Sequence, residues 1–454
     1  MRLYSKGDNY TLYAGDMLEL LEVIPPCSID AVITDPPYEL NFMGKGWDNS
    51  GIAFKAETWR KCFTALKTGG YLLAFGGTRT YHRIACAIED AGFEVRDCVI
   101  WLYGSGFPKS LNIGLAIDKI NGVESKVIGH SNNKIHLENL GEAGYKSEWD
   151  VKEAQNEWAG WGTALKPAYE PIIIARKPCE GSCVANVLKY GVGGLNIDAC
   201  RIGEGTGEVK TVQYPDIRGD LDCNCRCVYR ETAPVEYTIK DAGRYPSNVI
   251  LTYDETDERE VCGGMPNTTT GAVNVGNPNS RGLFGAGSSF IPNNSNGGDS
   301  GNASRYFYCA KASNRDREDG LTGFDDLIGG GMLGTEKQTL LTGGGNIRNN
   351  LRKNIHPTVK PCDLMQYLVR LVTPKGGTIL DPFNGSGSTG KAVMYENRDR
   401  QAGYKYIGIE ITPEYLPIAD ARIKHAITAP IDNPKPDKPI TGQITFDDLL
   451  KGGD

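Results

Sequence analysis

Short apolar runs alternate with amphipathic stretches over about the first 177 residues. Four runs have the length and composition of strands: Ile29–Thr34, Tyr71–Phe75, Val95–Trp101 and Pro171–Ala175. Between them, Thr58–Leu66 and Arg83–Ala91 carry apolar residues at a spacing compatible with helices. This alternation predicts an α/β fold.

The pattern changes twice further along the chain. From about Pro178 to Asn354 the sequence is dense in Gly, Asn and Ser, as in Gly271–Asn302, and we expect mostly loops there. Strand and helix patterns return from His356 to about Ile427, and they comprise Asp363–Val372 (helix), Thr378–Leu380 (strand), a helix from about Gly387 and Tyr406–Glu410 (strand). We therefore divide the chain into an α/β half (1–177), an irregular insertion (178–354), a second α/β half (355–427) and a flexible tail (428–454).

Composition excludes several classes of protein. The 454 residues include 49 basic and 56 acidic ones, and a net charge of −7 argues against a protein that coats DNA by bulk positive charge. No apolar run approaches the roughly 18 residues that a membrane span needs. The first residues lack the apolar core of a secretion signal, so we expect a cytoplasmic protein whose 13 cysteines are mostly thiols.

The first candidate site follows the strand Ile29–Thr34, which runs directly into Asp35-Pro36-Pro37-Tyr38. Prolines cannot continue the hydrogen-bond ladder, so the strand ends in a rigid corner at the edge of the sheet where ligands bind in α/β folds. A carboxylate, a backbone carbonyl on Pro36 and an aromatic ring together suit a planar base that bears an exocyclic amino group. An ordinary turn after a strand is the alternative interpretation.

The second candidate site follows Thr378–Leu380, where a strand leads into Asp381-Pro382-Phe383 and a glycine loop. Its glycines satisfy G-x-G-x-x-G, and Glu410 ends the next strand, where a carboxylate could hold ribose hydroxyls. Taken alone, this motif favours NAD or FAD. The intervening Asp-Pro-Phe, the short chain that follows and the distant first site argue for a nucleoside cofactor with a short charged tail. A turn with glycines for close packing remains the simpler alternative.

Together these motifs resemble the DNA amino-methyltransferases that use S-adenosyl-L-methionine, in their permuted, β-type order. That order is D-P-P-Y, a target-recognition region, then D-P-F-x-G-S-G, which correspond here to Asp35–Tyr38, the Gly/Asn-rich zone and Asp381–Gly387. His356–Pro361 matches the H-P-T-x-K-P element of the same group. The resemblance covers roughly residues 10–110, 160–177 and 354–425, and Gly104–Asn112 and Gly162–Lys177 are similar to phage and prophage members. It implies a Rossmann-like sheet built from both halves of the chain, with helices on both faces and a recognition insertion.

The resemblance also implies roles for single residues. The catalytic residues would be Asp35, Pro36, Pro37 and Tyr38, with Asp35 and the Pro36 carbonyl accepting hydrogen bonds from the target amino group and Tyr38 stacking on an extruded base. The cofactor-binding residues would be Asp16 near the adenine, Thr358 and Lys360 at the carboxylate, Asp381 at the methionine end, Pro382, Phe383, Gly385, Ser386 and Gly387 around the cofactor, and Glu410 on the ribose. Methyl transfer from a sulfonium is chiefly a matter of positioning, so no metal is expected.

Basic residues free of acidic neighbours give the best candidate for DNA contact. Lys337, Arg348, Arg352 and Lys353 lie in such a stretch, although basic runs often simply face solvent. We expect double-stranded DNA as partner, leave monomer and homodimer open, and see no restriction subunit. Cys223, Cys225 and Cys227 lack the usual zinc spacing, so thiols are preferred to a metal site. The tail segment Gln443–Leu450 could be a docking peptide or a frayed end.

The sequence therefore predicts a site-specific methyltransferase acting on adenine N6 in DNA, because the family's D-P-P-Y form is more often directed to adenine. N4-cytosine methylation is the first alternative. Methylation of RNA bases or glutamine amides, a catalytically silent DNA-binding or decoy protein, and a dinucleotide oxidoreductase are further alternatives. A restriction-modification or phage setting would suit the resemblance.

Overall fold

A computed structural model describes most of the two α/β halves and parts of the region between them. The residues described are 2–40, 46–103, 110–132, 148–203, 209–216, 232–240, 243–254, 267–270, 299–302, 307–312, 314–328, 339–341, 347–349 and 351–430. Among these residues, no helix is both long and apolar enough to cross a membrane.

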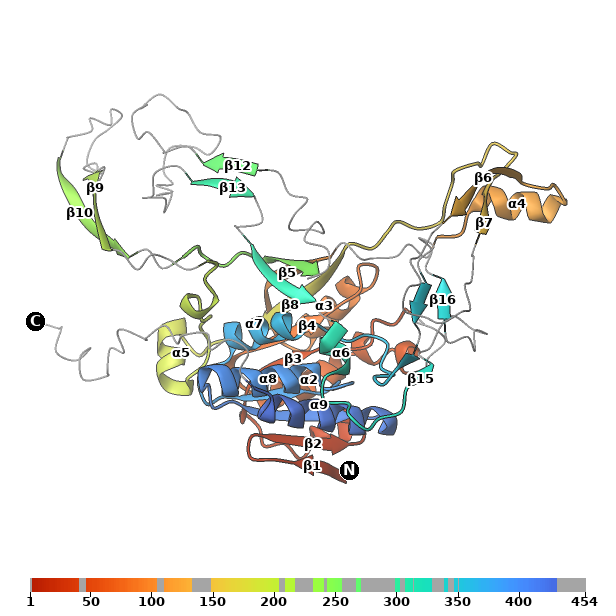
Figure 1. Ribbon diagram of the computed structural model, residues 1–454. Coiled ribbons are helices and arrows are strands. Elements are labelled where there is room, and N and C mark those ends of the chain that lie inside the picture. Colours follow the sequence, from red (N-terminus) through yellow and green to blue (C-terminus); the bar gives the residue numbers. More distant parts are fainter. Residues whose placement is uncertain are drawn as a thin grey trace, which may run out of the picture.

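A ten-stranded mixed sheet forms the centre of the molecule (Figure 1). Its strands are β1 (Arg2–Lys6), β2 (Tyr10–Ala14), β3 (Ile29–Thr34), β4 (Leu66–Phe75), β5 (Glu94–Leu102), β8 (Tyr169–Arg176), β11 (Val249–Asp254), β14 (Tyr308–Ala312), β19 (Thr378–Asp381) and β20 (Lys405–Glu410). Their order across the sheet is β1-β2-β20-β19-β3-β4-β8-β5-β11-β14.

The two halves of the chain interleave in this sheet. Strand β19, from the second half, lies between β20 and β3, and it is parallel to both. Strand β3 is in turn parallel to β4, whereas β8 runs antiparallel between β4 and β5. Because parallel strands end at the same edge, this arrangement brings the corner after β3 and the glycine loop after β19 side by side.

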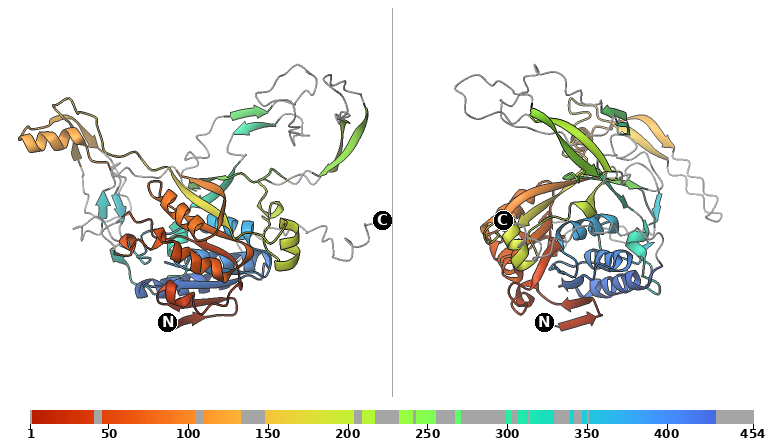
Figure 2. Two further views of the ribbon diagram at one scale, coloured as in Figure 1. Left: turned by 180° about the vertical axis from the view of Figure 1, so that it is seen from behind. Right: turned by 90° about the vertical axis from the view of Figure 1, so that its left-hand side faces the viewer.

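Helices cover both faces of the sheet (Figures 1 and 2). The α-helices are α1 (Met17–Leu20), α2 (Ala56–Ala65), α3 (Tyr81–Asp90), α4 (Ile113–Asn121), α5 (Cys183–Tyr190), α6 (Asn314–Glu318), α7 (Cys362–Val372), α8 (Ser388–Arg400) and α9 (Leu416–Thr428). Ala31 and Ile33 of β3 pack with α7, α8 and α9, whereas Val32 packs with α2 and α3. This two-sided burial explains why β3 is a continuous apolar run, and the predicted α/β fold with helices on both faces is confirmed.

Smaller elements complete the described structure. The two-stranded pairs are β6 (Lys126–Asn132) with β7 (Glu148–Glu153), β9 (Val209–Asp216) with β10 (Thr232–Lys240), β12 (Asn267–Thr270) with β13 (Asp299–Asn302), β15 (Leu327–Ile328) with β18 (Leu351–Arg352), and β16 (Thr339–Leu341) with β17 (Ile347–Asn349). Short 3-10 turns occupy Gly46–Asn49, Ile52–Phe54, Asp198–Cys200 and Pro413–Tyr415. Figure 1 shows β6, β7 and α4 projecting from the main body on one side.

The structure differs from the predicted division of the chain in the middle region. Strands β11 and β14 fall within the expected insertion of 178–354, yet they extend the central sheet beyond β5. Their short apolar runs were not predicted as strands because the surrounding sequence is rich in glycine and asparagine. The hairpin of β1 and β2 was also not anticipated, although β2 pairs in parallel with β20. The predicted tail lies outside the described residues from 431 onward.

Candidate active site

A cavity of about 830 Å³ lies at the sheet edge where β3 and β19 end. Its wall includes the whole Asp35–Tyr38 corner, and Phe383, Gly385 and Glu410 from the second half of the chain. The segment Thr163–Glu170, which leads into β8, forms another part of the wall. The cavity therefore joins the two sites that the sequence indicated separately.

Hydrogen bonds fix the corner after β3. The hydroxyl of Thr34, the last residue of the strand, is buried and donates to Asp381 Oδ1 at 2.7 Å. After the two prolines, the Tyr38 hydroxyl lies 2.8 Å from Asp35 Oδ1 and 2.9 Å from Glu170 Oε2. Burial and the charges of these carboxylates raise the pKa of Tyr38 well above its ordinary value, so the hydroxyl stays protonated as a donor.

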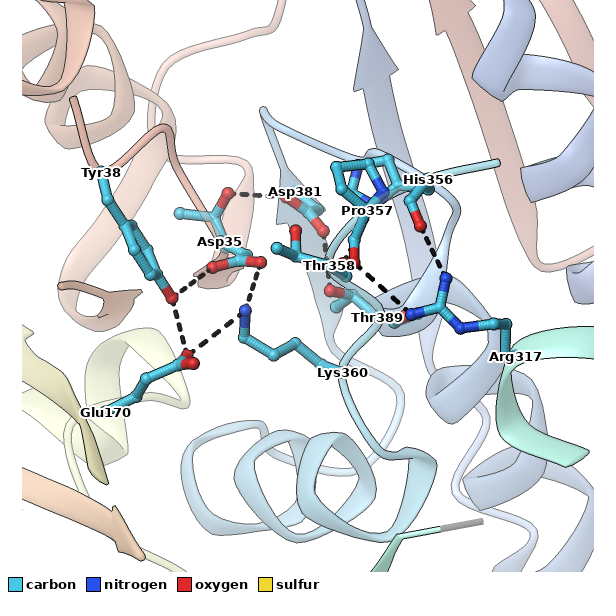
Figure 3. Close-up of polar contacts among 12 residues, drawn as sticks. Asp35, Tyr38, Glu170, Arg317, His356, Pro357, Thr358, Lys360, Asp381 and Thr389 are labelled. Carbon is cyan, nitrogen blue, oxygen red and sulfur yellow. Dashed lines mark hydrogen bonds and ion pairs between the residues drawn. The ribbon is translucent and has the colours of Figure 1, made fainter. Parts of the chain in front are cut away.

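Lys360 lies at this corner (Figure 3). Its Nζ is 2.5 Å from Asp35 Oδ2 and 3.4 Å from Glu170 Oε2. Burial opposes its charge, but the two carboxylates outweigh burial and raise the pKa of the Lys360 ammonium. The sequence placed Lys360 at the carboxylate of the cofactor. In the structure its ammonium pairs with the predicted catalytic aspartate, and the cofactor contact stays a prediction.

The glycine loop after β19 presents a backbone cradle to the cavity. Gly385 has φ +51°, and a Cβ at this position would lie 2.7 Å from His356 Nε2. Its N–H donates to Glu410 Oε2 at 2.6 Å, while Glu410 Oε1 accepts from Thr412 N at 2.7 Å. Burial raises the pKa of Glu410, although these backbone donors oppose the shift. The carboxylate is thus held rigidly at the end of β20.

Three residues of the predicted cofactor loop lie behind the cavity wall. Asp381 accepts hydrogen bonds from Thr34, from Thr389 Oγ1 at 2.7 Å and from Phe383 N at 3.1 Å, and its burial raises its pKa to about 6. The backbone and side-chain oxygens of Ser386 accept from the buried Arg422. Gly387 has φ +76° and packs against Ala419 in α9. These residues shape the loop instead of lining the cavity.

The remaining predicted cofactor residues line the cavity. Asp16 forms the N-cap of α1, where its Oδ1 accepts from Leu18 N at 2.8 Å, and Pro382 adds to the wall beside Phe383. Thr358 is exposed, and its carbonyl lies 2.9 Å from His356 Nδ1.

His356 lines the cavity beneath Gly385. Its desolvation, together with nearby cations, lowers its pKa to about 3, so the imidazole stays neutral. Its ring also meets Tyr415 edge-on, with centroids 4.6 Å apart.

Glu170, Arg317 and Arg422 are residues that the sequence analysis missed. Glu170 precedes an apolar run, and the antiparallel insertion of β8 places it beside Asp35. Arg317 of α6 donates to the carbonyl oxygens of His356 at 2.8 Å and Pro357 at 3.4 Å (Figure 3). A charged residue at the border of a buried apolar run was the available signal for Glu170. No local pattern identified the two arginines.

Of the predicted DNA-contacting residues, only Arg352 and Lys353 have described side chains. Lys337 lies outside the described residues, and Arg348 lies in β17, where only the backbone is described. Arg352 ends β18, and Lys353 follows it, with its backbone N–H donating to Glu318 Oε2 at 3.0 Å. Cys223, Cys225 and Cys227 also lie outside the described part, within which no cluster of three His, Cys, Asp or Glu side chains could hold a metal ion.

The cavity has features that fit a nucleoside cofactor. Glu410 and Asp16 offer carboxylate acceptors for hydroxyl or amino groups, and Phe383 offers an aromatic ring. Gly385 lets a ligand approach the backbone where a side chain would collide with His356. At the neighbouring corner, Asp35 and the Pro36 carbonyl offer acceptors for a second, planar group. The cavity could thus hold a methyl donor and its acceptor together.

Comparisons with known proteins agree with this geometry. A family model described as DNA methylase, N6_N4_Mtase, matches residues 29–190 and 302–421. The type II methyltransferase M.HindIII of Haemophilus influenzae is 28% identical over 144 residues, which are 31% of this chain and 37% of that protein. M2.DpnII of Streptococcus pneumoniae is 41% identical over 69 residues, 15% of this chain and 24% of that protein. The chain thus matches only about a quarter to just over a third of the length of these relatives.

Solved structures of low similarity cover most of the chain. The PvuII DNA methyltransferase, described as cytosine-N4-specific, has a TM-score of 0.38 and 14% identity, covering 92% of this chain and 87% of that one. A complex of M1.HpyAVI with SAM has a TM-score of 0.35 and 15% identity, covering 91% of this chain and 98% of that one.

Proposed function

Since this chain belongs to the N6/N4 DNA methylase family, we propose that it transfers a methyl group from S-adenosyl-L-methionine to the exocyclic N6 amino group of adenine in double-stranded DNA. One observation carries the proposal. The Asp35–Tyr38 corner and the loop that contains Gly385 open into the same cavity, although they lie at opposite ends of the chain. A methyl donor and an amino acceptor bound at these two positions would be neighbours.

S-Adenosyl-L-methionine is the cofactor of this family, so the cofactor predicted from the sequence is confirmed. When bound, it supplies a methyl group on a positively charged sulfur. We assign the ribose hydroxyls to Glu410, whose carboxylate is oriented by the N–H groups of Gly385 and Thr412. Phe383 and Asp16 would contact the nucleoside from the same wall. Backbone hydrogen bonds hold Glu410 and Asp16 in place, which reduces the entropy lost on binding.

Asp35 and Pro36 would act on the target base. Their carboxylate and carbonyl oxygens accept the two N–H groups of the exocyclic amine, which makes its nitrogen more pyramidal and a better nucleophile. The Asp35 charge also stabilises the positive charge that develops on this nitrogen during transfer. The Tyr38 ring would stack on the base, which must leave the duplex because its amino group is unreachable inside the helix.

Asp35 at the first position of the corner supports adenine as the target, because the D-P-P-Y form of the resembled family is more often directed to adenine N6 than to cytosine N4. Both bases carry a planar ring with an exocyclic amine, so the same acceptors serve either one. Chemical identification of the methylated base distinguishes adenine from cytosine.

The test uses purified protein, unmethylated genomic DNA and S-adenosyl-L-methionine labelled in its methyl group. The DNA is digested to nucleosides, and the labelled base is identified. We expect labelled N6-methyladenine from the wild type, no label from Asp35→Ala, and full activity from Asp90→Ala, which changes an exposed carboxylate at the end of α3. Labelled N4-methylcytosine would overturn the base but keep the chemistry. Cofactor binding without any label in DNA would overturn the proposed function.

A further inference from the structure

The catalytic corner contains a closed ring of four polar side chains (Figure 3). The Tyr38 hydroxyl and the Lys360 ammonium both contact Asp35, at 2.8 Å and 2.5 Å. The same two donors also contact Glu170 Oε2, at 2.9 Å and 3.4 Å. Two carboxylates thus surround two donors, of which the ammonium can donate to both at once and the single Tyr38 proton to one at a time.

The surroundings of Lys360 keep it inside this ring. Its side chain is only 6% exposed, and its ammonium lies 5.0 Å from the centroid of the Phe75 ring and 5.5 Å from that of Tyr38. A charge buried in this way loses several kcal/mol of hydration, so it needs a carboxylate partner at all times. Aromatic rings add an attraction that is too weak to replace that partner.

The target amino group would share the Asp35 carboxylate with Lys360. If the base donates to Asp35 as proposed above, it shares that carboxylate with Lys360, whose ammonium on Oδ2 offsets the negative charge that the methylated nitrogen needs during transfer. Glu170 Oε2 is an acceptor within reach of both donors, and Lys360 would need to move by only about half an ångström to reach ordinary hydrogen-bond length there.

We propose that Glu170 is a positioning residue that takes Lys360 away from Asp35 when the target base enters. Lys360 then acts as a placeholder: it occupies Asp35 while the cavity is empty, and it pairs with Glu170 while Asp35 accepts the amino group. This role rests on the proposed methylation of an exocyclic amine. It predicts that the damage from losing Glu170 comes from Lys360, because a lysine without a second carboxylate competes with the base.

A double-mutant cycle on unfolding tests the contact without any substrate. Lys360→Met leaves Asp35 and Glu170 facing each other without the ammonium, so the melting temperature falls by several degrees. Adding Glu170→Gln removes one of the two opposed charges, and the melting temperature rises again. Losses that simply add in the double variant would overturn the shared contact.

A second cycle on turnover tests the positioning role. Glu170→Gln lowers kcat by about tenfold while the Kd for S-adenosyl-L-methionine, measured by calorimetry, stays unchanged. The double variant Glu170→Gln with Lys360→Met methylates faster than Glu170→Gln alone, because the competing donor is gone. Glu94→Gln is the matched control, since Glu94 also pairs with a buried cation, Arg176 at 2.9 Å, but lies outside the cavity wall. It should keep the wild-type kcat.

The outcomes separate this inference from the proposed function. If the wild type methylates DNA and Glu170→Gln does so at the same rate, only the role of Glu170 is overturned. A double variant slower than Glu170→Gln, or a loss of cofactor affinity in Lys360→Met, also overturns it, because Lys360 would then serve the reaction or the cofactor directly. Cofactor binding with no methylation of DNA by the wild type overturns the proposed function, and the role of Glu170 falls with it.

Discussion

Asp381 provides the sharpest test of how the glycine loop is built. Asp381 is 2% exposed, and its carboxyl group accepts hydrogen bonds from the hydroxyls of Thr34 and Thr389 and from the N–H of Phe383. Burial, which outweighs these donors, raises its pKa from 3.8 to about 6. Asparagine has the same shape and keeps an acceptor, but it cannot ionise. Asp381→Asn therefore removes the charge while leaving most contacts in place.

The raised pKa of Asp381 fixes the sign of the pH effect. Between pH 3.8 and 6 the folded protein binds a proton at Asp381 that the unfolded chain has lost, so the wild type loses stability as the pH rises. A pKa difference of about two units corresponds to about 3 kcal/mol, of which about 2 kcal/mol falls between pH 4.5 and 7.5. Asp381→Asn has no such loss at this position. Relative to the wild type, the free energy of unfolding of Asp381→Asn should therefore rise by about 2 kcal/mol between about pH 4.5 and about pH 7.5.

Urea unfolding of both proteins across this pH range measures the difference directly. Asp90→Asn, which changes an exposed carboxylate away from the glycine loop, serves as control for the loss of one acidic side chain. Parallel curves for the wild type and Asp381→Asn would refute the reasoning, since Asp381 would then titrate alike in the folded and unfolded chains. A variant that loses stability relative to the wild type as the pH rises would show that ionised Asp381 is favoured in the fold.

Two further predictions concern the loop and a reactive thiol. Gly385→Ala should weaken binding of S-adenosyl-L-methionine at least tenfold in calorimetry, because its Cβ would lie 2.7 Å from His356 Nε2. Gly376→Ala is the control and should bind the cofactor as the wild type does, because Gly376 also has a positive φ (+77°) but has open space around the Cβ. Equal losses of affinity in both variants would show that backbone strain alone is the cause. Cys183 should react with iodoacetamide at neutral pH faster than an ordinary thiol, because Arg176 lies 3.0 Å from its sulfur and lowers its pKa. Arg176→Met should slow that reaction, and an unchanged rate would contradict the assigned cause.

The parts of the fold that could be predicted from sequence are those with strong local patterns. Strand β3 is a continuous apolar run because helices cover both of its faces, and prolines mark its end. Strand β19 is likewise a buried apolar run, and the glycines that follow it mark its end. By contrast, β11 and β14 are short, lie among irregular segments, and join the sheet through pairing between distant parts of the chain. Such pairing leaves no local trace in the sequence.

The candidate site was predictable to the same degree. The sequence identified Asp35 and Glu410 because they follow or end an apolar strand, and Tyr38 because it closes the proline corner after one. It did not identify Glu170, whose place beside Asp35 depends on an antiparallel strand inserted between β4 and β5. It also placed Lys360 at the cofactor, because the motif alone does not show that its ammonium lies between two carboxylates.

The most direct test of the central claim is to map modified bases in DNA treated with the pure protein. Unmethylated genomic DNA is incubated with the wild type and S-adenosyl-L-methionine, then sequenced by a single-molecule method that reports the modified base and its neighbours. Our account predicts N6-methyladenine at one recurrent sequence context, and its absence when Asp35→Ala is used. Unmodified DNA, or equal modification by Asp35→Ala, would contradict the account.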